Sequence, residues 1–196
     1  VKKLKVRTFL PKDCGFKYRN TFFKNEWKGK YIITSATFRL KQNLQKEELY
    51  QGLEEELTTF AKKPYTVKDM MNAVIRLREK KLPSLNEYGT CGCFFENPLI
   101  TKEKYEEIKK QIPDLASYPA RDNLVKISAG KLLDELGWKG KWVCNVGVFD
   151  KHALCVVTKK DATGKEIYEF VKKMQEDVKK KYGITLVSEV NIIKNN

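Results

Sequence analysis

Reactive side chains gather in one short stretch of the sequence, EYGTCGCFFENP, at residues 87–98. Its two cysteines, Cys91 and Cys93, stand on either side of a glycine and precede two phenylalanines. A zinc site needs about four thiol or imidazole ligands, and the chain adds only one histidine, His152, so we expect no metal site. The spacing also differs from the C-x-x-C of a redox pair. Two interpretations remain: one thiol positioned on a glycine-rich backbone that approaches a ligand closely, or an ordinary turn with buried cysteines.

Two other residues are of types that could take part in chemistry. Glu189 interrupts the apolar run ITLVSEVNII, where a carboxylate needs either a partner or a catalytic role. A glutamate at a sheet edge that faces water would fit the pattern equally well. His152, beside Lys151, could contact a polar ligand or lie on the surface without a role. The sequence contains neither a phosphate-binding G-x-x-x-x-G-K-[ST] loop nor a G-x-G-x-x-G motif, so these residues alone do not identify a ligand.

The composition narrows the class of protein that could carry these residues. The 196 residues are 41% hydrophobic and 33% charged, as in globular proteins. The net charge of +14 comes almost entirely from lysines scattered among glutamates, without the arginine clusters and aromatic platforms of base-reading proteins. We therefore expect an anionic small-molecule substrate and no nucleic acid. No apolar run approaches the roughly 18 residues of a membrane span, and an odd number of cysteines, five, fits a reducing cytoplasm.

The hydrophobic pattern predicts an α+β fold to position these side chains. Thr66, followed three residues later by Asp69, predicts a capping box at the start of one helix. Gly137 and Gly183 predict the ends of two others. The predicted helices cover residues 46–63, 67–81, 101–113, 128–137 and 161–182, and the predicted strands cover 1–9, 30–40, 141–149, 152–159 and 184–193.

The pattern also predicts which side chains are buried. Cys144 and Cys155 fall in apolar strand-like runs, and we expect them to be small core residues. The helix over 67–81 is expected to bury an apolar face formed by Met70, Met71, Val74, Ile75 and Leu77. The helix over 161–182 has a similar stripe formed by Ile167, Phe170, Val171, Met174 and Val178.

Four stretches resemble, in the same order, those of the UDP-N-acetylenolpyruvoylglucosamine reductase family: CGFKYRNTFFK, LREKKLPSLNEYGTCGCFFENP, LVKISAGKLLDELGWKG and ITLVSEVNII. The most specific feature is Lys-Leu-Pro followed about ten residues later by glycine, Ser or Cys, two aromatic residues and Asn-Pro. This family uses NADPH and bound FAD to reduce the enolpyruvyl ether of UDP-N-acetylglucosamine enolpyruvate to UDP-N-acetylmuramate, a step of peptidoglycan biosynthesis. The resemblance implies a substrate-binding α+β domain, preceded by the last strands of a flavin-binding domain.

The resemblance also implies two catalytic residues. Hydride would reach the terminal carbon of the enolpyruvyl group, and the adjacent carbon would then be protonated by a hydroxyl or thiol at the end of the glycine-rich loop. Here that group is Cys93, where serine is common in the family. An unperturbed thiol, with a pKa of about 8.5, keeps its proton at neutral pH and can donate it. Glu189 matches the family's glutamate that stabilises the intermediate or assists its protonation.

Four further residues are implied to bind the substrate. Tyr18 and Lys81 would contact the diphosphate, Asn97 matches the asparagine of the Asn-Pro pair, and His152 falls where the family places a polar side chain. Two positions depart from the family. They are Glu96, which stands where lysine is usual, and Lys131, which replaces an aromatic residue.

The expected domains follow from the same resemblance. We expect a remnant of the flavin domain at residues 1–44, the substrate-binding domain at 45–183, and a last strand at 184–196 that returns towards the flavin site. The chain begins at Val1 without a methionine, and we expect it to be cut from a longer, cytoplasmic, monomeric enzyme whose FAD site lies upstream. Such a segment would be inactive alone. The alternative is a stand-alone, non-catalytic module that binds nucleotide sugars.

Overall fold

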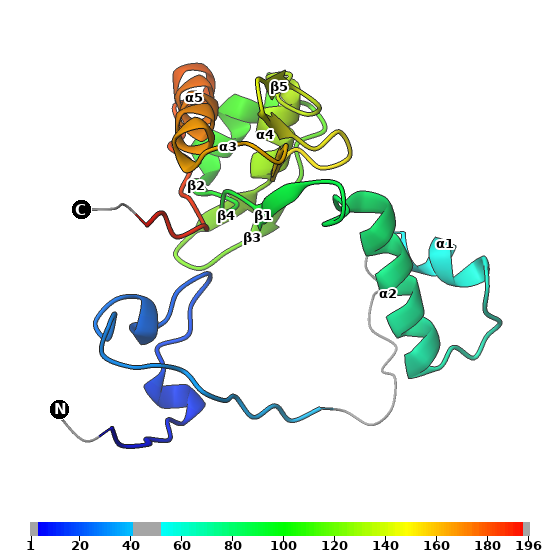
Figure 1. The fold of residues 1–196 in the computed structure, drawn as a ribbon, viewed down its shortest axis with the longest axis vertical. Coiled ribbons are helices and arrows are strands. Elements are labelled where there is room, and N and C mark those ends of the chain that lie inside the picture. Colours follow the sequence, from blue (N-terminus) through cyan, green and yellow to red (C-terminus); the bar gives the residue numbers. More distant parts are fainter. Residues whose placement is uncertain (1–3, 41–51, 194–196) are drawn as a thin grey trace. The chain divides into compact units, whose positions relative to one another are not determined.

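The computed structural model describes residues 4–40 and 52–193. The chain divides into two compact units, residues 1–44 and 45–196 (Figure 1). The second unit holds the α+β fold that the sequence predicts, with helices and antiparallel sheets around one large hydrophobic core. No helix in the described part of the chain is long and apolar enough to cross a membrane.

In its described residues, 4–40, the first unit is held together by aromatic contacts and contains no sheet. Two short 3-10 helices, η1 (Pro11–Asp13) and η2 (Phe22–Lys24), are its regular elements. The ring of Trp27 lies 4.9 Å from that of Phe9 and 5.6 Å from that of Tyr31, measured between centroids. The strands predicted over 1–9 and 30–40 are wrong for the described residues, because neither segment has a neighbour there that completes a hydrogen-bonded ladder.

The second unit contains both helices and strands. Its helices are α1 (Leu53–Thr58), α2 (Val67–Lys81), α3 (Lys102–Lys109), α4 (Ala129–Glu135) and α5 (Gly164–Tyr182). Its strands are β1 (Gly89–Cys93), β2 (Leu99–Thr101), β3 (Ser117–Pro119), β4 (Leu124–Ile127), β5 (Trp142–Val143), β6 (Val146–Val148) and β7 (Cys155–Thr158).

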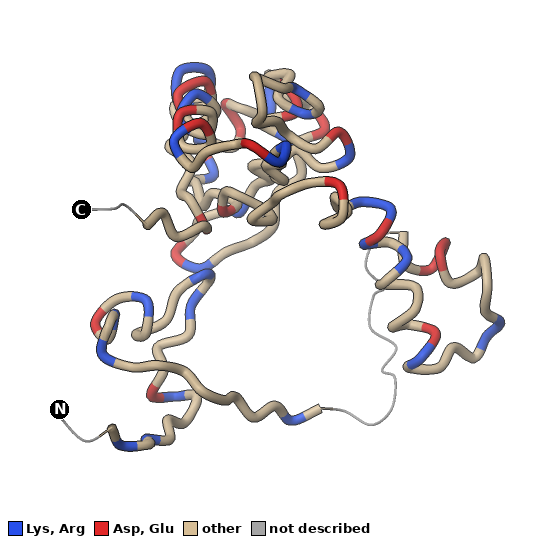
Figure 2. Tube along the Cα trace, in the orientation of Figure 1, with Lys and Arg blue, Asp and Glu red and all other residues tan. Residues whose placement is uncertain are grey.

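Two antiparallel sheets carry the core. One has four strands in the order β1-β7-β6-β5, and the other has three in the order β2-β4-β3. Helix α5 packs against β6 and α4, whereas α3 packs against β2 and β4 (Figure 1). Basic and acidic residues interleave along the outer surface of α5 (Figure 2), which leaves its apolar stripe for the core.

Helix starts follow the predicted local signals. Thr66 and Asp69 form the expected capping box of α2, in which the Asp69 carboxylate accepts from the Thr66 N–H at 2.8 Å. Gly183 ends α5 in the left-handed conformation, with a φ of 70°. The predicted stripe of α5 is also confirmed, because Phe170, Val171, Met174 and Val178 are buried, with Ile167 packed beside them.

The predicted buried face of α2 is mostly wrong. Ala73 and Leu77 are its buried residues, and they form a separate small core with Leu53 and Leu57 of α1. Helix α1 has only six residues, so it covers a narrow strip of its longer neighbour. The other predicted positions are partly buried or exposed. Met70 is partly buried, and the exposed ones are Met71, Val74 and Ile75.

The predicted strand over 141–149 is two strands joined by a tight turn. Cys144 occupies this turn with a φ of 51° and is exposed, so the expectation that it is a core residue is wrong. Cys155, in contrast, is buried as expected. The predicted strand over 184–193 is reduced to a single bridge, between Phe95 and Ser188.

Replacing Met174 by alanine should test the core directly. Its side chain is fully buried in the large hydrophobic core. We expect Met174→Ala to lower the free energy of unfolding by roughly 2 to 5 kcal/mol, because the cavity it leaves can collapse only in part. Urea unfolding measures this change. The exposed neighbour Lys173 provides the control, and an equal loss from Lys173→Ala would contradict the packing described here.

Candidate functional site

A β-bulge sets the position of Cys93. Thr90 of β1 pairs with Val157 of β7, and Cys93 pairs with Cys155. Between these two pairs β1 therefore contains one residue more than β7. Gly92 lies within this irregularity with a φ of 80°, a conformation that side chains with a Cβ rarely adopt. Bulges of this kind redirect the next side chain and recur beside active sites. The glycine of CGC is therefore needed for backbone geometry.

The residues after Cys93 are held on both sides by backbone hydrogen bonds. On one side, the N–H of Phe94 donates to the carbonyl of Leu154 at 2.9 Å. On the other side, the N–H of Glu189 donates to the carbonyl of Phe94, and the N–H of Glu96 donates to the carbonyl of Val187, each at 2.9 Å. The two predicted catalytic residues, far apart in sequence, are thus brought to adjacent segments of the chain.

Cys93 belongs to a compact group of three side chains. The ligand atoms of Cys93, His152 and Cys155 all lie within 4.8 Å of one another. Cys93 and His152 are half-buried, and Cys155 is buried beneath them. A side-chain hydrogen bond with Cys93, followed by burial, raises the pKa of the Cys155 thiol well above its ordinary value. Cys155 therefore keeps its proton at neutral pH.

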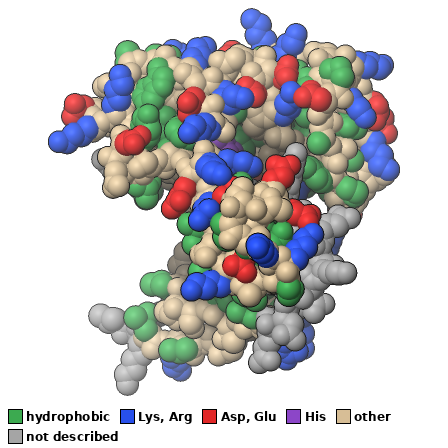
Figure 3. Space-filling view, turned by 90° about the vertical axis from the view of Figure 1, so that its right-hand side faces the viewer, with side chains coloured by type: hydrophobic (Ala, Val, Ile, Leu, Met, Phe, Trp, Pro, Cys, Tyr) green, Lys and Arg blue, Asp and Glu red, His purple; other side chains and the backbone are tan. Residues whose placement is uncertain are grey.

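His152 is held in a neutral form. Its Nδ1 accepts a hydrogen bond from the N–H of Leu154 at 3.3 Å. Burial lowers the pKa of His152, and the positive charge of Lys81 lowers it further. The imidazole is half-buried and partly visible in Figure 3. Lys81, the exposed last residue of α2, is thus close enough for its charge to act on the site.

Asn97 lies at the edge of the site and holds a helix start. Its Oδ1 accepts the N–H of Ala129, the first residue of α4, at 3.0 Å. Ser128 caps the same helix by accepting the N–H of Lys131. The side-chain oxygen of Asn97 therefore has a structural partner, and the expected contact with a substrate stays a prediction that would use its amide group.

The remaining predicted residues lie elsewhere. Tyr18 belongs to the first unit, at a tight turn closed by two hydrogen bonds between Lys17 and Asn20. Glu96 is half-buried next to Asn97. Lys131 forms two ion pairs, in which its Nζ lies 2.7 Å from a carboxylate oxygen of Asp114 and 2.8 Å from one of Glu135.

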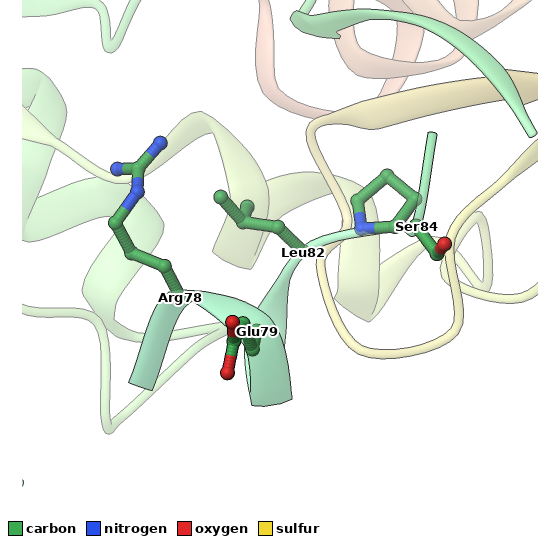
Figure 4. A pocket seen from close by; sticks show the side chains of 5 residues that line it. Arg78, Glu79, Leu82 and Ser84 are labelled. Atoms are coloured by element: carbon green, nitrogen blue, oxygen red, sulfur yellow. The ribbon is translucent and has the colours of Figure 1, made fainter. Parts of the chain in front are cut away.

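A cavity of about 340 Å³ lies at the end of α2, immediately next to Lys81 in sequence (Figure 4). It is lined by Arg78, Glu79, Leu82, Pro83 and Ser84. None of the predicted site residues lines it, so this cavity by itself does not define the candidate site.

Sequence reasoning missed the part that Cys155 plays. It was predicted as a core residue, and it is one, but it also faces Cys93 across the β1–β7 pair. Only the pairing of these two strands could reveal this contact, and the bulge at Gly92 shifts the register by one residue. Counting apolar and polar positions in either strand gives no signal for it.

Comparisons with known proteins place this arrangement in a family. The model of the C-terminal domain of UDP-N-acetylenolpyruvoylglucosamine reductase matches residues 84–193. UDP-N-acetylenolpyruvoylglucosamine reductases of Flavobacterium johnsoniae and Burkholderia ambifaria are 39% and 36% identical to the chain over 189 and 178 residues. These alignments cover 96% and 90% of this chain, and 56% and 51% of the relatives.

The matched range contains both sheets and helices α3 to α5, with Cys93, Asn97, His152 and Glu189. The chain belongs to the UDP-N-acetylenolpyruvoylglucosamine reductase family, as its four motifs predict, and it spans about half the length of the curated relatives it matches.

The state of His152 can be measured without ambiguity, because it is the only histidine in the chain. In an NMR titration we expect its pKa below the ordinary 6.5. Since the folded state then binds fewer protons than the unfolded state, stability should fall as the pH falls below about 6.5. Lys81→Met should raise this pKa, whereas Lys68→Met, at the other end of α2, should leave it unchanged. A wild-type pKa at or above 6.5 would contradict the burial described.

The role of Asn97 in holding α4 predicts a difference between two substitutions. Asn97→Ala leaves the buried N–H of Ala129 without its acceptor and should cost about 1 to 3 kcal/mol of unfolding free energy. Asn97→Asp keeps an acceptor oxygen and should cost less. Chemical denaturation of both variants measures the difference, and equal losses would show that the hydrogen bond is not what Asn97 contributes.

Proposed function

We propose that the protein to which this chain belongs is an oxidoreductase that converts UDP-N-acetylglucosamine enolpyruvate to UDP-N-acetylmuramate, a cytoplasmic step of peptidoglycan synthesis. In this proposal the chain supplies the substrate-binding domain and the proton donor. The observation that carries it is the position of Cys93, half-buried between β7 and the segment that contains Glu189. A thiol and a carboxyl group presented on adjacent segments of the chain are suited to protonate a carbon and to assist that proton transfer.

The charges of the site favour an anionic substrate. Lys81 is a cation beside the neutral His152, and the chain carries a net charge of +14. A diphosphate and a carboxylate would both be attracted by such a field. We infer that Lys81 and Tyr18 contact the diphosphate, while His152 and the amide of Asn97 bind other polar groups of the nucleotide sugar.

The reduction needs a hydride as well as a proton. Thiol, imidazole and carboxylate side chains exchange protons but cannot give a hydride, so the donor set of this chain fits a reductase that uses a redox cofactor. FAD reduced by NADPH supplies this hydride when bound, and we propose that its site lies mainly in the part of the protein that this chain does not contain. Within this chain, Cys93 gives its proton to the carbon beside the substrate carboxylate, and Glu189 assists this protonation.

Substitution of Cys93 in the full-length protein tests this role. Cys93→Ala removes the proton donor and should lower turnover by roughly 10² to 10⁴-fold, whereas Cys93→Ser keeps a donor and should retain measurable turnover. NADPH-dependent formation of UDP-N-acetylmuramate is the measurement. Cys91→Ala is the matched control, two residues away on the same strand, and should remain active. Full turnover by Cys93→Ala would exclude Cys93 as the general acid.

A further inference from the structure

We propose that Cys93, His152 and Cys155 form a binding site for a thiophilic divalent cation such as Zn²⁺. The sequence argument against a metal counted only Cys91, Cys93 and His152 as ligands, fewer than the four that a zinc site needs. The fold replaces that pair by a different one, because Cys155 faces Cys93 from β7 and His152 joins them from the turn before it. Two sulfurs and an imidazole nitrogen are ligands that zinc prefers.

The geometry of the group suits one ion. All three ligand atoms lie within 4.8 Å of one another, and two thiolates and an imidazole around one tetrahedral zinc are separated by less than this. Small side-chain rotations would therefore complete the site. The backbone beneath it is fixed, since Cys93 and Cys155 are paired residues of one sheet.

The burial pattern leaves a fourth position open. Cys155 is buried, while Cys93 and His152 are only half-buried, so an ion held by the three would be reached from one side. Three protein ligands and one water or small anion form a coordination that zinc commonly adopts in proteins. The site would thus be accessible to metal from solution without unfolding.

The binding step balances without an oxidant or reductant. Each thiol loses its proton to the solvent, two sulfur–zinc bonds form, and the neutral imidazole donates a ring-nitrogen lone pair and gives up the hydrogen bond that its Nδ1 accepts from Leu154, so no atom changes oxidation state. If the proposed function holds, an ion on Cys93 would remove the proton that reduction requires, and micromolar zinc would inhibit the enzyme. That consequence rests on the proposed function, whereas metal binding itself does not.

Cobalt substitution tests binding independently of activity. Co²⁺ added to the full-length protein under a phosphine reductant should give thiolate-to-metal charge transfer and the d–d bands of tetrahedral cobalt, at the red end of the spectrum beyond flavin absorption. Zn²⁺ should abolish these bands at one equivalent. The reductant prevents a disulfide between the paired Cys93 and Cys155. Absence of tetrahedral bands in the wild-type protein would overturn the proposal.

Matched substitutions assign the ligands. Cys155→Ser and His152→Gln should each weaken cobalt binding by at least about tenfold, while Cys144→Ser, which removes an exposed thiol at the β5–β6 turn, should leave it unchanged. Circular dichroism identifies any variant that fails to fold. If Cys155→Ser fails to fold, His152→Gln, at a half-buried position, still tests the site. Unchanged affinity in a folded Cys155→Ser or His152→Gln variant would contradict the assignment.

Discussion

The candidate site depends on backbone hydrogen bonds that hold residues 93–96 between two other segments. Strand β7 pairs with them on one side and residues 187–189 on the other, although these three pieces come from separate parts of the chain. The peptide groups at Phe94 are fully used in this way, because its N–H and its carbonyl each have a partner. Buried peptide groups that are all paired resist displacement. The thiol of Cys93 and the backbone of Glu189 are therefore fixed relative to one another by main chain instead of by flexible side chains.

Local electrostatics keeps Cys155 and His152 uncharged at neutral pH. Burial and contact with Cys93 keep the Cys155 thiol protonated, while burial and the charge of Lys81 keep His152 neutral. The site thus presents uncharged proton carriers at neutral pH beside one exposed cation. Under the proposed function, the charge of Lys81 would attract the anionic substrate, and the neutral groups would keep protons available for transfer. The Cys93 and Cys155 thiols become metal ligands once their protons leave, whereas the neutral imidazole coordinates directly through a ring nitrogen.

Much of the fold could be predicted from local signals, and the site only in part. Caps such as Thr66 with Asp69, and the stripe of α5, depend on residues close in sequence and were confirmed. The buried face of α2 could not be predicted, because burial depends on the length of α1, its partner. The contact between Cys93 and Cys155 depends on a register shifted by one bulge. The family resemblance identified Cys93 and Glu189 from motifs, yet nothing in either motif indicates that their backbones are joined through Phe94.

A crystal structure of the full-length protein with bound UDP-N-acetylmuramate is the best test of whether Cys93 is the proton donor. We expect the Sγ of Cys93 to lie in contact, at about 3.5 Å, with the carbon that carries the new proton. Glu189 should lie on the same side of the ligand. Lys81 should face the anionic part of the nucleotide sugar. A product whose reduced carbon lies against another proton donor, with Cys93 pointing away, would contradict the assignment of Cys93 as the proton donor.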